Sequence, residues 1–405
     1  MAQNSSELSV LSNELLIVSN YYHPELTGIA PVVSDLASWA AEQNLCPSVL
    51  TARPSYPLSQ IYEGYENGQR DSEIDRGVAV RRVWSVVSKT RGTFGRLVDE
   101  LSFVASAVLK NRRQYRGVIA VCPSIFVVLV SPLFRRRGGK VVAIVYDIQS
   151  GLARSLKFGG GGLVVRLLRW LEARALNRCD SIIVLSEAMR SELTTIGVFS
   201  PIEVILPQVD VREIVPIPET PAEGPVLLYS GNLGRKQGLD QVLELARTLR
   251  QRGSPAVIHI RGQGSERVEL EAEALQSGLS NVRFSDLAPR ERLSEALGEA
   301  TLHLVPQNPS GASFALPSKV FSIMAAQRAF VATAAPDTPL EQVIAQSGGG
   351  ICVEADNPGL FADAVEALLG DDAARAALAR SGRRYVETEV DREIVCRRIL
   401  EQVVG

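Results

Sequence analysis

The chain is organised around one stretch just past its middle, Val226-Leu227-Leu228-Tyr229-Ser230-Gly231-Asn232-Leu233-Gly234-Arg235-Lys236-Gln237-Gly238-Leu239. An apolar run ending at Tyr229 stops at a loop with three glycines, two cations and two amides. From Leu239 onward the apolar residues recur at helical spacing, which predicts a strand, a Gly-rich loop and a helix. Such a joint suits a phosphate, because glycines let backbone N–H groups approach a ligand and the helix start is electropositive. Many joints of this kind carry glycine for turn geometry alone.

The same alternation of strand, loop and helix runs through both halves of the chain. It predicts strands at 15–19, 47–51, 78–83, 117–121, 140–146 and 181–185, and then at 226–229, 256–260, 282–284, 302–305, 330–333 and 351–353. Helical periods lie between them and close the chain. Alternating strands and helices favour parallel sheets, so we expect an α/β protein with two Rossmann-like doubly wound domains.

The domain limits follow from changes in composition. A polar tail at 1–14 precedes the first domain at 15–200, and a proline-rich linker or hinge at 201–224 leads to the second domain at 225–385. The last stretch, 386–405, is expected to be a helix that packs back on the first domain. In such proteins ligands bind in the cleft where the carboxyl ends of the strands meet.

Composition and charge limit the classes of partner. The chain has 405 residues and a net charge of −2, but residues 1–200 carry +6 and residues 201–405 carry −8. A basic first half favours an anionic partner, such as a membrane surface or a phosphorylated acceptor, and nothing indicates nucleic acid. Five scattered cysteines and three separated histidines predict no metal site. With no secretory signal and no uninterrupted apolar span, a cytoplasmic location is expected.

Three loops of the second domain are expected to share one edge of its sheet. They are 230–238, then Gly262-Gln263-Gly264, and then 308–318, which leads into a helix from Lys319. Pro317 suits the first helical turn and would leave the N–H groups of Ser318 and Lys319 free. Two helix starts with cations beside them predict a diphosphate cradle.

These motifs resemble a known family. GNLGRKQG after a strand, then RGQG, PSKVFSIMAA and GGGICVEADNPGLFADAVEAL, resemble the donor half of a GT-B glycosyltransferase of family 4. The first half agrees, because YHPELTGI at 22–29 and DSIIVLSEAM at 180–189 resemble the branch that builds colanic acid and other exopolysaccharides. The resemblance runs from about residue 15 to residue 400, and its motifs do not specify the sugar.

The resemblance implies roles for individual residues of the second domain. The diphosphate would be held by the glycine-loop amides and by two cations, the residues concerned being Gly231, Asn232, Gly234, Arg235 and Lys236. Gly262 and Gly264 would let the nucleotide lie over the sheet edge, with its base near Leu287 and Ala288. Ser318 and Lys319 would bind the distal phosphate and the charge that develops on departure.

In the first domain, Gly28 would let its loop approach the donor. Asp147, at a strand end, would face the sugar or the acceptor hydroxyl, although an acid there is also a common helix cap. The sequence departs from the family at two pairs of positions. Asn232 and Gln237 stand where many members have cations, and Phe314 and Ser322 stand where two glutamates are usual. Ser322 would then make only a weak contact with the ribose.

The resulting hypothesis is a metal-independent glycosyltransferase with no cofactor. It would move a sugar from a GDP- or UDP-sugar to a polyprenyl-linked oligosaccharide, in exopolysaccharide or O-antigen biosynthesis, at the inner face of the plasma membrane. Lacking an obvious general base, it is expected to retain configuration, with the departing phosphate accepting the proton. Arg112-Arg113 and Arg135-Arg136-Arg137 are expected to end helices, and either to serve the helix dipole or to touch anionic lipid. A nucleotide-sugar epimerase of the same fold and a non-catalytic nucleotide-sugar-binding scaffold are the alternatives.

Overall fold

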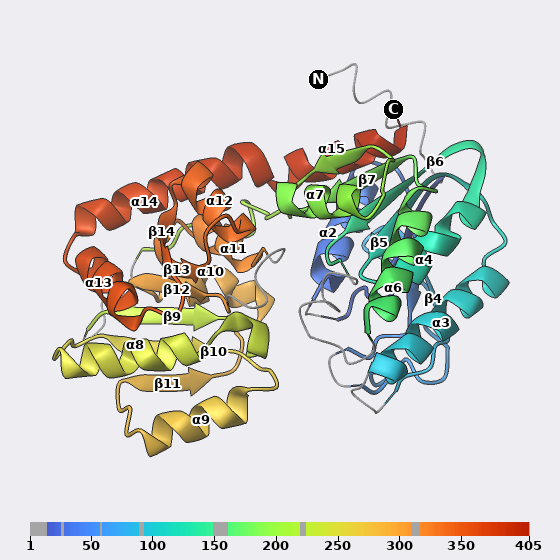
Figure 1. Cartoon of the computed structure of the whole chain (residues 1–405). Coiled ribbons are helices and arrows are strands. Elements are labelled where there is room, and N and C mark those ends of the chain that lie inside the picture. The colour runs from blue at the N-terminus through green and yellow to red at the C-terminus, as the bar shows by residue number, and fades with distance from the viewer. Residues whose placement is uncertain are drawn as a thin grey trace. The chain divides into compact units, whose positions relative to one another are not determined.

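The chain folds into two compact α/β units, shown in a computed structural model (Figure 1). The structure describes residues 14–25, 28–56, 59–88, 93–148, 161–218, 224–308 and 316–404. Unit 1 comprises Met1–Pro207 and Arg392–Gly405, and unit 2 comprises Gln208–Asp391. Each contains one mostly or wholly parallel sheet between helices, so the predicted doubly wound architecture is confirmed. Within the described ranges, no helix is long and apolar enough to cross a membrane.

Unit 1 is built on an eight-stranded sheet with the order β3-β4-β2-β1-β5-β6-β7-β8. Its strands are β1 (Leu15–Val18), β2 (Ser48–Ala52), β3 (Ser72–Asp75), β4 (Val78–Val83), β5 (Tyr115–Cys122), β6 (Arg135–Val145), β7 (Ser181–Val184) and β8 (Ile202–Val204). Only β3 runs antiparallel, as the edge partner of β4. The central strands are nearly continuous apolar runs because helices bury both of their faces.

Helices of unit 1 form two layers on this sheet. One layer contains α2 (Ala30–Glu42) and the C-terminal α15 (Arg392–Val404), which contact each other. The other contains α3 (Thr93–Lys110), α4 (Ile125–Val130) and α6 (Gly161–Leu176), with α4 in contact with both of its neighbours. The turn η1 (Ser131–Phe134) and α7 (Glu187–Thr195) complete the unit. The last helix is therefore fixed to unit 1, where Arg392 bonds to Glu42.

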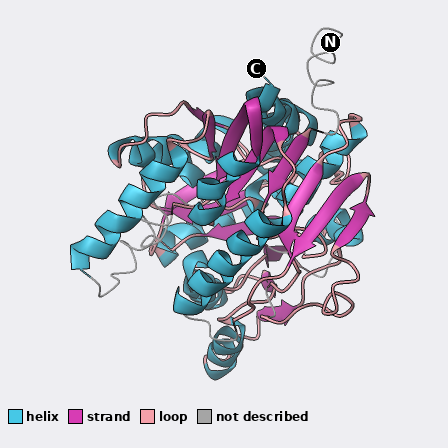
Figure 2. Ribbon diagram, turned by 90° about the vertical axis from the view of Figure 1, so that its right-hand side faces the viewer, coloured by secondary structure: helices cyan, strands magenta, loops and turns pink. Residues whose placement is uncertain are grey.

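Unit 2 has a six-stranded parallel sheet with the order β11-β10-β9-β12-β13-β14. Its strands are β9 (Val226–Ser230), β10 (Val257–Arg261), β11 (Val282–Ser285), β12 (Leu302–Pro306), β13 (Phe330–Ala334) and β14 (Gly350–Glu354). The helical segments are η2 (Arg235–Gln237), α8 (Asp240–Gln251), α9 (Arg267–Gln276), η3 (Arg290–Arg292), α10 (Leu293–Gly298), α11 (Lys319–Ala325), α12 (Pro339–Ser347), α13 (Pro358–Leu369), α14 (Asp372–Tyr385) and η5 (Val386–Val390). Figure 2 shows helices packed along the strands.

The core of unit 2 explains why the stretch at 226–239 organises it. Strand β9 lies centrally in the sheet, and its residues Leu227 and Tyr229 are fully buried. They pack in one hydrophobic cluster with Leu239, which directly precedes α8, and with Val242 and other apolar residues of α8. The apolar residues at helical spacing therefore form the contact between a central strand and the helix that follows it.

Two short strands and one basic run differ from the sequence expectations. Strands β3 and β8 were not expected, and β8 lies inside the segment 201–224 that was expected to be a linker. Short strands with few apolar residues give little signal by themselves and are added to a sheet by a longer neighbour. The expectation that Arg135, Arg136 and Arg137 end a helix is wrong, because they begin the strand β6.

Candidate functional site

The carboxyl edge of the unit 2 sheet brings the expected loops 230–238 and 262–264 together, while residues 309–315 of the third expected loop lie outside the described part of the structure. The N–H of Gly231 donates to the carbonyl of Arg261 at 2.9 Å, and the N–H of Leu233 donates to that of Gln263 at 2.8 Å. One strand further on, the N–H of Gly262 donates to the carbonyl of Ser285 at 2.9 Å. The loops after β9, β10 and β11 are therefore joined by backbone hydrogen bonds and form one surface.

Gly262 and Gly264 are required by the close approach of these loops. A Cβ atom at Gly262 would lie 1.9 Å from the carbonyl oxygen of Gly231, and one at Gly264 would lie 2.2 Å from that of Leu233. Real Cβ atoms do not come so close to backbone atoms, so larger residues would separate the two loops. Packing between loops thus explains both glycines, whether or not a nucleotide lies over them.

Lys319 is the most unusual charged residue of this edge. It begins helix α11, and its Nζ atom lies 3.7 Å from the ring centroid of Tyr229. This nitrogen is buried and has no hydrogen-bond partner among the described residues. Burial lowers the pKa of Lys319 to about 7, since removing an ammonium group from water disfavours its charged form.

The backbone at Gly231 makes room for this ammonium group. Gly231 has a φ of +147°, and a Cβ there would lie 2.9 Å from Lys319 Nζ. Tyr229 lies on another side of the Lys319 nitrogen, and its hydroxyl donates to the carbonyl of Asn232 at 2.7 Å. Tyr229 therefore supports both the loop and the lysine, and sequence analysis did not identify it as a site residue. The signal was present, since an aromatic residue ends the strand just before the Gly-rich loop.

The remaining residues of the glycine loop differ in exposure. Asn232 is exposed, while Gly234 is partly buried, and a Cβ there would lie 3.0 Å from Asn232 Nδ2. The side chain of Arg235 is 90% exposed and lies 3.6 Å from Glu266, measured from Nε to Oε1. Arg235 is therefore available to an anion at the surface. Lys236 falls within η2, and its side chain lies outside the described part of the structure.

Four further residues expected at the site follow β11 or belong to α11. Leu287 is exposed and Ala288 is partly buried, just beyond the carboxyl end of β11. Ser318 is exposed at the N-terminal end of α11, and Ser322 lies one turn after Lys319 on the same helix. Phe314, the other departure from the family pattern, lies outside the described residues.

Two expected site residues belong to unit 1. Gly28 has a φ of +68°, a left-handed conformation that favours glycine, and a Cβ there would contact Tyr56 at 3.7 Å. Asp147 is exposed just after the carboxyl end of β6, and its carbonyl accepts a contact from the Cys122 thiol at 3.9 Å. Both therefore lie where ligands bind in open α/β sheets.

Glu25 is a buried carboxyl group close to Gly28 in sequence. Its Oε1 atom accepts hydrogen bonds from the N–H groups of Ser55 and Tyr56, both at 2.8 Å. Burial raises the pKa of Glu25 to about 7, while these two backbone N–H groups act in the opposite direction. Glu25 thus connects the loops that follow β1 and β2 at the carboxyl edge of unit 1. Its burial was not apparent from the sequence.

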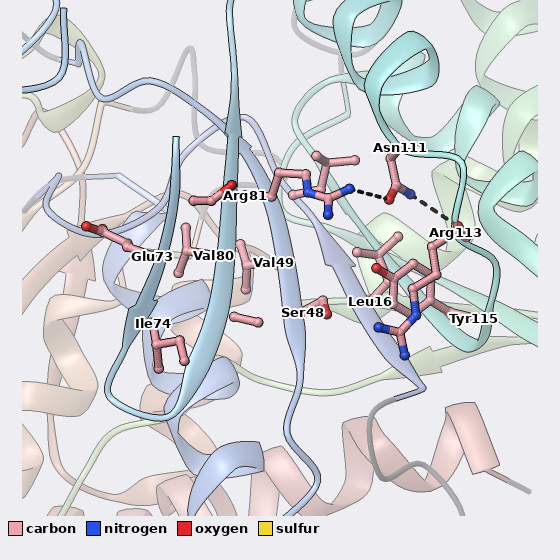
Figure 3. Close-up of a pocket in the computed structure, with 13 residues that line it drawn as sticks. Leu16, Ser48, Val49, Glu73, Ile74, Val80, Arg81, Asn111, Arg113 and Tyr115 are labelled. Carbon is pink, nitrogen blue, oxygen red and sulfur yellow. Dashed lines mark hydrogen bonds between the residues drawn. The ribbon is translucent and has the colours of Figure 1, made fainter. Parts of the chain in front are cut away.

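A groove of about 470 Å³ lies at the other end of the unit 1 sheet (Figure 3). Its lining includes Leu16, Ser48 and Tyr115, which stand at or next to the amino ends of β1, β2 and β5. Arg81 donates to the side-chain oxygen of Asn111 across it at 3.3 Å. Because the expected ligand sites are at the carboxyl ends, this groove does not belong to them.

Comparison with known proteins assigns the chain to a class. Residues 210–385 match the family of Glycosyl transferases group 1, and residues 27–208 match the Glycosyl transferase 4-like domain. The chain is 30% identical over 416 residues to the Putative colanic acid biosynthesis glycosyl transferase WcaI of Escherichia coli (strain K12), covering 97% of this chain and 100% of that protein. It therefore belongs to this glycosyltransferase family, as the sequence motifs predicted. The chain is a hexosyltransferase-type glycosyltransferase.

Solved structures agree on the fold. Sucrose-phosphate synthase from Thermosynechococcus elongatus superimposes with a TM-score of 0.75 at 16% identity, covering 96% of this chain and 97% of that one. Anabaena HepE, in complex with UDP and glucose, has a TM-score of 0.70 at 14% identity, and the match covers 97% of this chain and 99% of that one. WaaG, a glycosyltransferase involved in lipopolysaccharide biosynthesis, has a TM-score of 0.67 at 16% identity, and the match covers 96% of this chain and 100% of that one. All three share the GT-B arrangement of two Rossmann-like domains.

Proposed function

We propose that this glycosyltransferase takes a sugar from a UDP- or GDP-sugar whose diphosphate binds at the carboxyl edge of unit 2. The observation that carries the proposal is the buried ammonium group of Lys319, which has no hydrogen-bond partner among the described residues. A buried charge without a partner is costly, and an anion would relieve that cost. A diphosphate carries the charge required and would also meet the exposed Arg235. Anabaena HepE, of the same fold, was solved with UDP-glucose.

The chemistry requires stabilisation of negative charge on the departing diphosphate. Cations and oriented N–H groups placed where that charge develops lower the barrier most effectively when they need no rearrangement. Lys319 and Arg235 supply cations at this edge, and Lys236 adds a third cation in the same loop. Ser318 is proposed to bind the distal phosphate, and Ser322 to contact the ribose. The nucleotide base is proposed to lie near Leu287 and Ala288.

We further propose that the reaction retains the configuration of the sugar and needs no metal ion. The departing phosphate would accept the proton of the acceptor hydroxyl, and Asp147 of unit 1 would orient the sugar or that hydroxyl. The acceptor is proposed to be a polyprenyl-linked oligosaccharide of exopolysaccharide or O-antigen biosynthesis. Support comes from the WcaI relative, whose name refers to colanic acid biosynthesis, and from the fold shared with WaaG.

The direct test supplies UDP- and GDP-sugars with lipid-linked acceptors, in the presence of EDTA, and follows the product by mass spectrometry and NMR. Transfer with retained anomeric configuration is expected. Release of an epimerised nucleotide-sugar without acceptor would instead favour an epimerase. Donor binding without transfer would favour a non-catalytic scaffold. Asp147→Asn is expected to lower transfer while leaving the affinity for UDP or GDP unchanged, because Asp147 belongs to the acceptor side.

A peripheral contact between unit 1 and an anionic membrane at the cytoplasmic face is part of this proposal. Helix α6 exposes Leu167 and Trp170, which are 61% and 60% accessible, next to the exposed Arg166 and Arg174. The acid of this helix, Glu172, is buried. Apolar, aromatic and cationic side chains on one helix face are typical of helices that bind at a lipid interface.

The basic run at the start of β6 supports this contact less well than the sequence indicated. Arg135 pairs with Asp180 at 3.0 Å, and Arg136 pairs with Glu14. Sedimentation with phosphatidylglycerol vesicles is therefore expected to depend on Trp170 and Arg174 more than on Arg135. If Trp170→Ala and Arg174→Gln bind as the wild type does, α6 is not the contact.

A further inference from the structure

Tyr229 and Lys319 form an unusual pair at the end of the central strand of unit 2. The Lys319 Nζ atom lies 3.7 Å from the centroid of the Tyr229 ring, and Tyr229 is fully buried. On another side, the missing side chain of Gly231 leaves the space that the ammonium group occupies. No described carboxylate forms an ion pair with it, so among the described residues the ring is its principal electrostatic partner.

An aromatic ring can fill this role because its face is electronegative. A cation over the ring face gains about 0.5 to 2 kcal/mol, and the gain is largest where water is excluded. Unlike a carboxylate, the ring does not neutralise the ammonium group or occupy its N–H donors. Lys319 can therefore be held in place and remain available to an anion, which a salt bridge would not allow.

We propose that Tyr229 is a positioning residue for Lys319: its ring holds the terminal nitrogen beside Gly231, already in place to meet a donor phosphate. This inference rests on the proposed binding of a diphosphate at the same edge. The nitrogen stays over the ring when the phosphate binds, the anion favours its protonated form, and its N–H groups are directed to the ligand.

The hydroxyl of Tyr229 has a separate task. It donates to the carbonyl of Asn232 at 2.7 Å and lies 3.5 Å from Gln237 Oε1, so it restrains the glycine loop. Replacing Tyr229 by Phe removes this restraint and keeps the ring. The contribution of the ring can then be measured against Tyr229→Phe as the reference.

The test replaces Tyr229 by phenylalanine, then by 4-fluoro-, 3,5-difluoro- and 3,4,5-trifluorophenylalanine. Fluorine withdraws electron density from the ring face while the shape of the ring is nearly kept, so the attraction for a cation falls stepwise. We expect the affinity for UDP or GDP, measured by calorimetry, to fall at each step. The total loss should lie between about twofold and thirtyfold, the range that corresponds to about 0.5 to 2 kcal/mol. A purely structural ring would show no such series.

Tyr115 provides the matched control, because Arg113 lies 5.1 Å from its ring centroid in unit 1. The same series there should leave the affinity for UDP and GDP unchanged. Uridine and guanosine, which lack phosphates, should bind all Tyr229 variants alike. If affinity is unchanged or rises along the Tyr229 series, the positioning role is wrong while the proposed function stands. If the wild type binds neither UDP nor GDP, the proposed function fails, and this inference fails with it.

Discussion

Glu25 in unit 1 and Lys319 in unit 2 are both ionisable groups buried near the carboxyl edge of a sheet, and their surroundings differ. In unit 1 the carboxyl of Glu25 accepts two backbone hydrogen bonds, whereas in unit 2 the Lys319 nitrogen lies over an aromatic ring and has no hydrogen-bond partner among the described residues. Burial shifts the pKa of both toward about 7, upward for Glu25 and downward for Lys319. A buried group with backbone partners connects loops, while one without them is suited to receive a ligand.

The largest effect is expected from Lys319→Met. Loss of one donor that faces developing charge typically costs a hundredfold or more, so kcat should fall by about 100-fold. The fold should remain and gain stability, because an ammonium group is no longer buried. Enzyme assays and thermal melting test both parts, with Lys110→Met, at an exposed residue of α3, as the control. Unchanged activity would remove Lys319 from the site.

Glu25→Gln should change the pH dependence of stability instead of catalysis. The pKa of Glu25 is about 7 in the folded protein and 4.5 as its ordinary value. The unfolded chain therefore loses its proton first as pH rises, and stability falls between 4.5 and 7. The variant should lose this pH dependence, which changes the free energy of unfolding by up to about 3 kcal/mol between pH 4.5 and 7. Urea unfolding at pH 4.5, 6 and 7.5 measures it, and an unchanged slope would contradict the burial of this carboxyl.

Lys319 should produce the opposite slope in a different pH window. Its pKa is about 7 when folded and 10.5 as its ordinary value. Because the unfolded chain binds a proton in this window and the folded chain does not, stability should rise between pH 7 and 10.5. Lys319→Met should remove that rise and Glu25→Gln should not.

Glycine substitutions compare the two loops directly. Gly231→Ala places a Cβ 2.9 Å from Lys319 Nζ at a φ of +147°, whereas Gly28→Ala meets only Tyr56 at 3.7 Å. Both changes introduce backbone strain of about 1 to 2 kcal/mol. Only Gly231→Ala should also displace the ammonium group and weaken the binding of UDP or GDP, by about tenfold. Equal losses of binding in the two variants, by calorimetry, would show that backbone strain alone is responsible.

The smallest effect is expected from Arg235→Gln. Because the side chain of Arg235 is 90% exposed, water and salt screen its attraction for a phosphate. We expect a loss of affinity for UDP or GDP of about two- to fivefold, which is the size that an exposed ion pair contributes. The difference between the variant and the wild type should disappear in about 0.5 M salt, because salt screens exposed charges. A larger, salt-resistant loss would mean that the loop buries Arg235 when the donor binds.

Much of the fold could be predicted because the main strands are nearly continuous apolar runs. The central strands β1, β5, β9 and β12 have this pattern, whereas the short strands β3 and β8 have few apolar residues and were missed. The site was predicted as a set of loops, since the carboxyl ends of neighbouring parallel strands must meet. Which atoms of those loops touch could not be predicted, because it depends on packing between segments far apart in the chain.

The family, the two Rossmann-like domains and the loops that carry glycines and cations could all be inferred from the sequence alone. Local spacing is enough for these, because periodicity and glycine placement are properties of neighbouring residues. Tertiary contacts were needed to show that Gly262 and Gly264 serve loop packing and that Tyr229 lies beside Lys319. Tyr229 belongs to strand β9 and Lys319 to helix α11, and water is excluded from the space between them only when the chain folds. That exclusion makes the ammonium group of Lys319 a strong candidate for binding a phosphate.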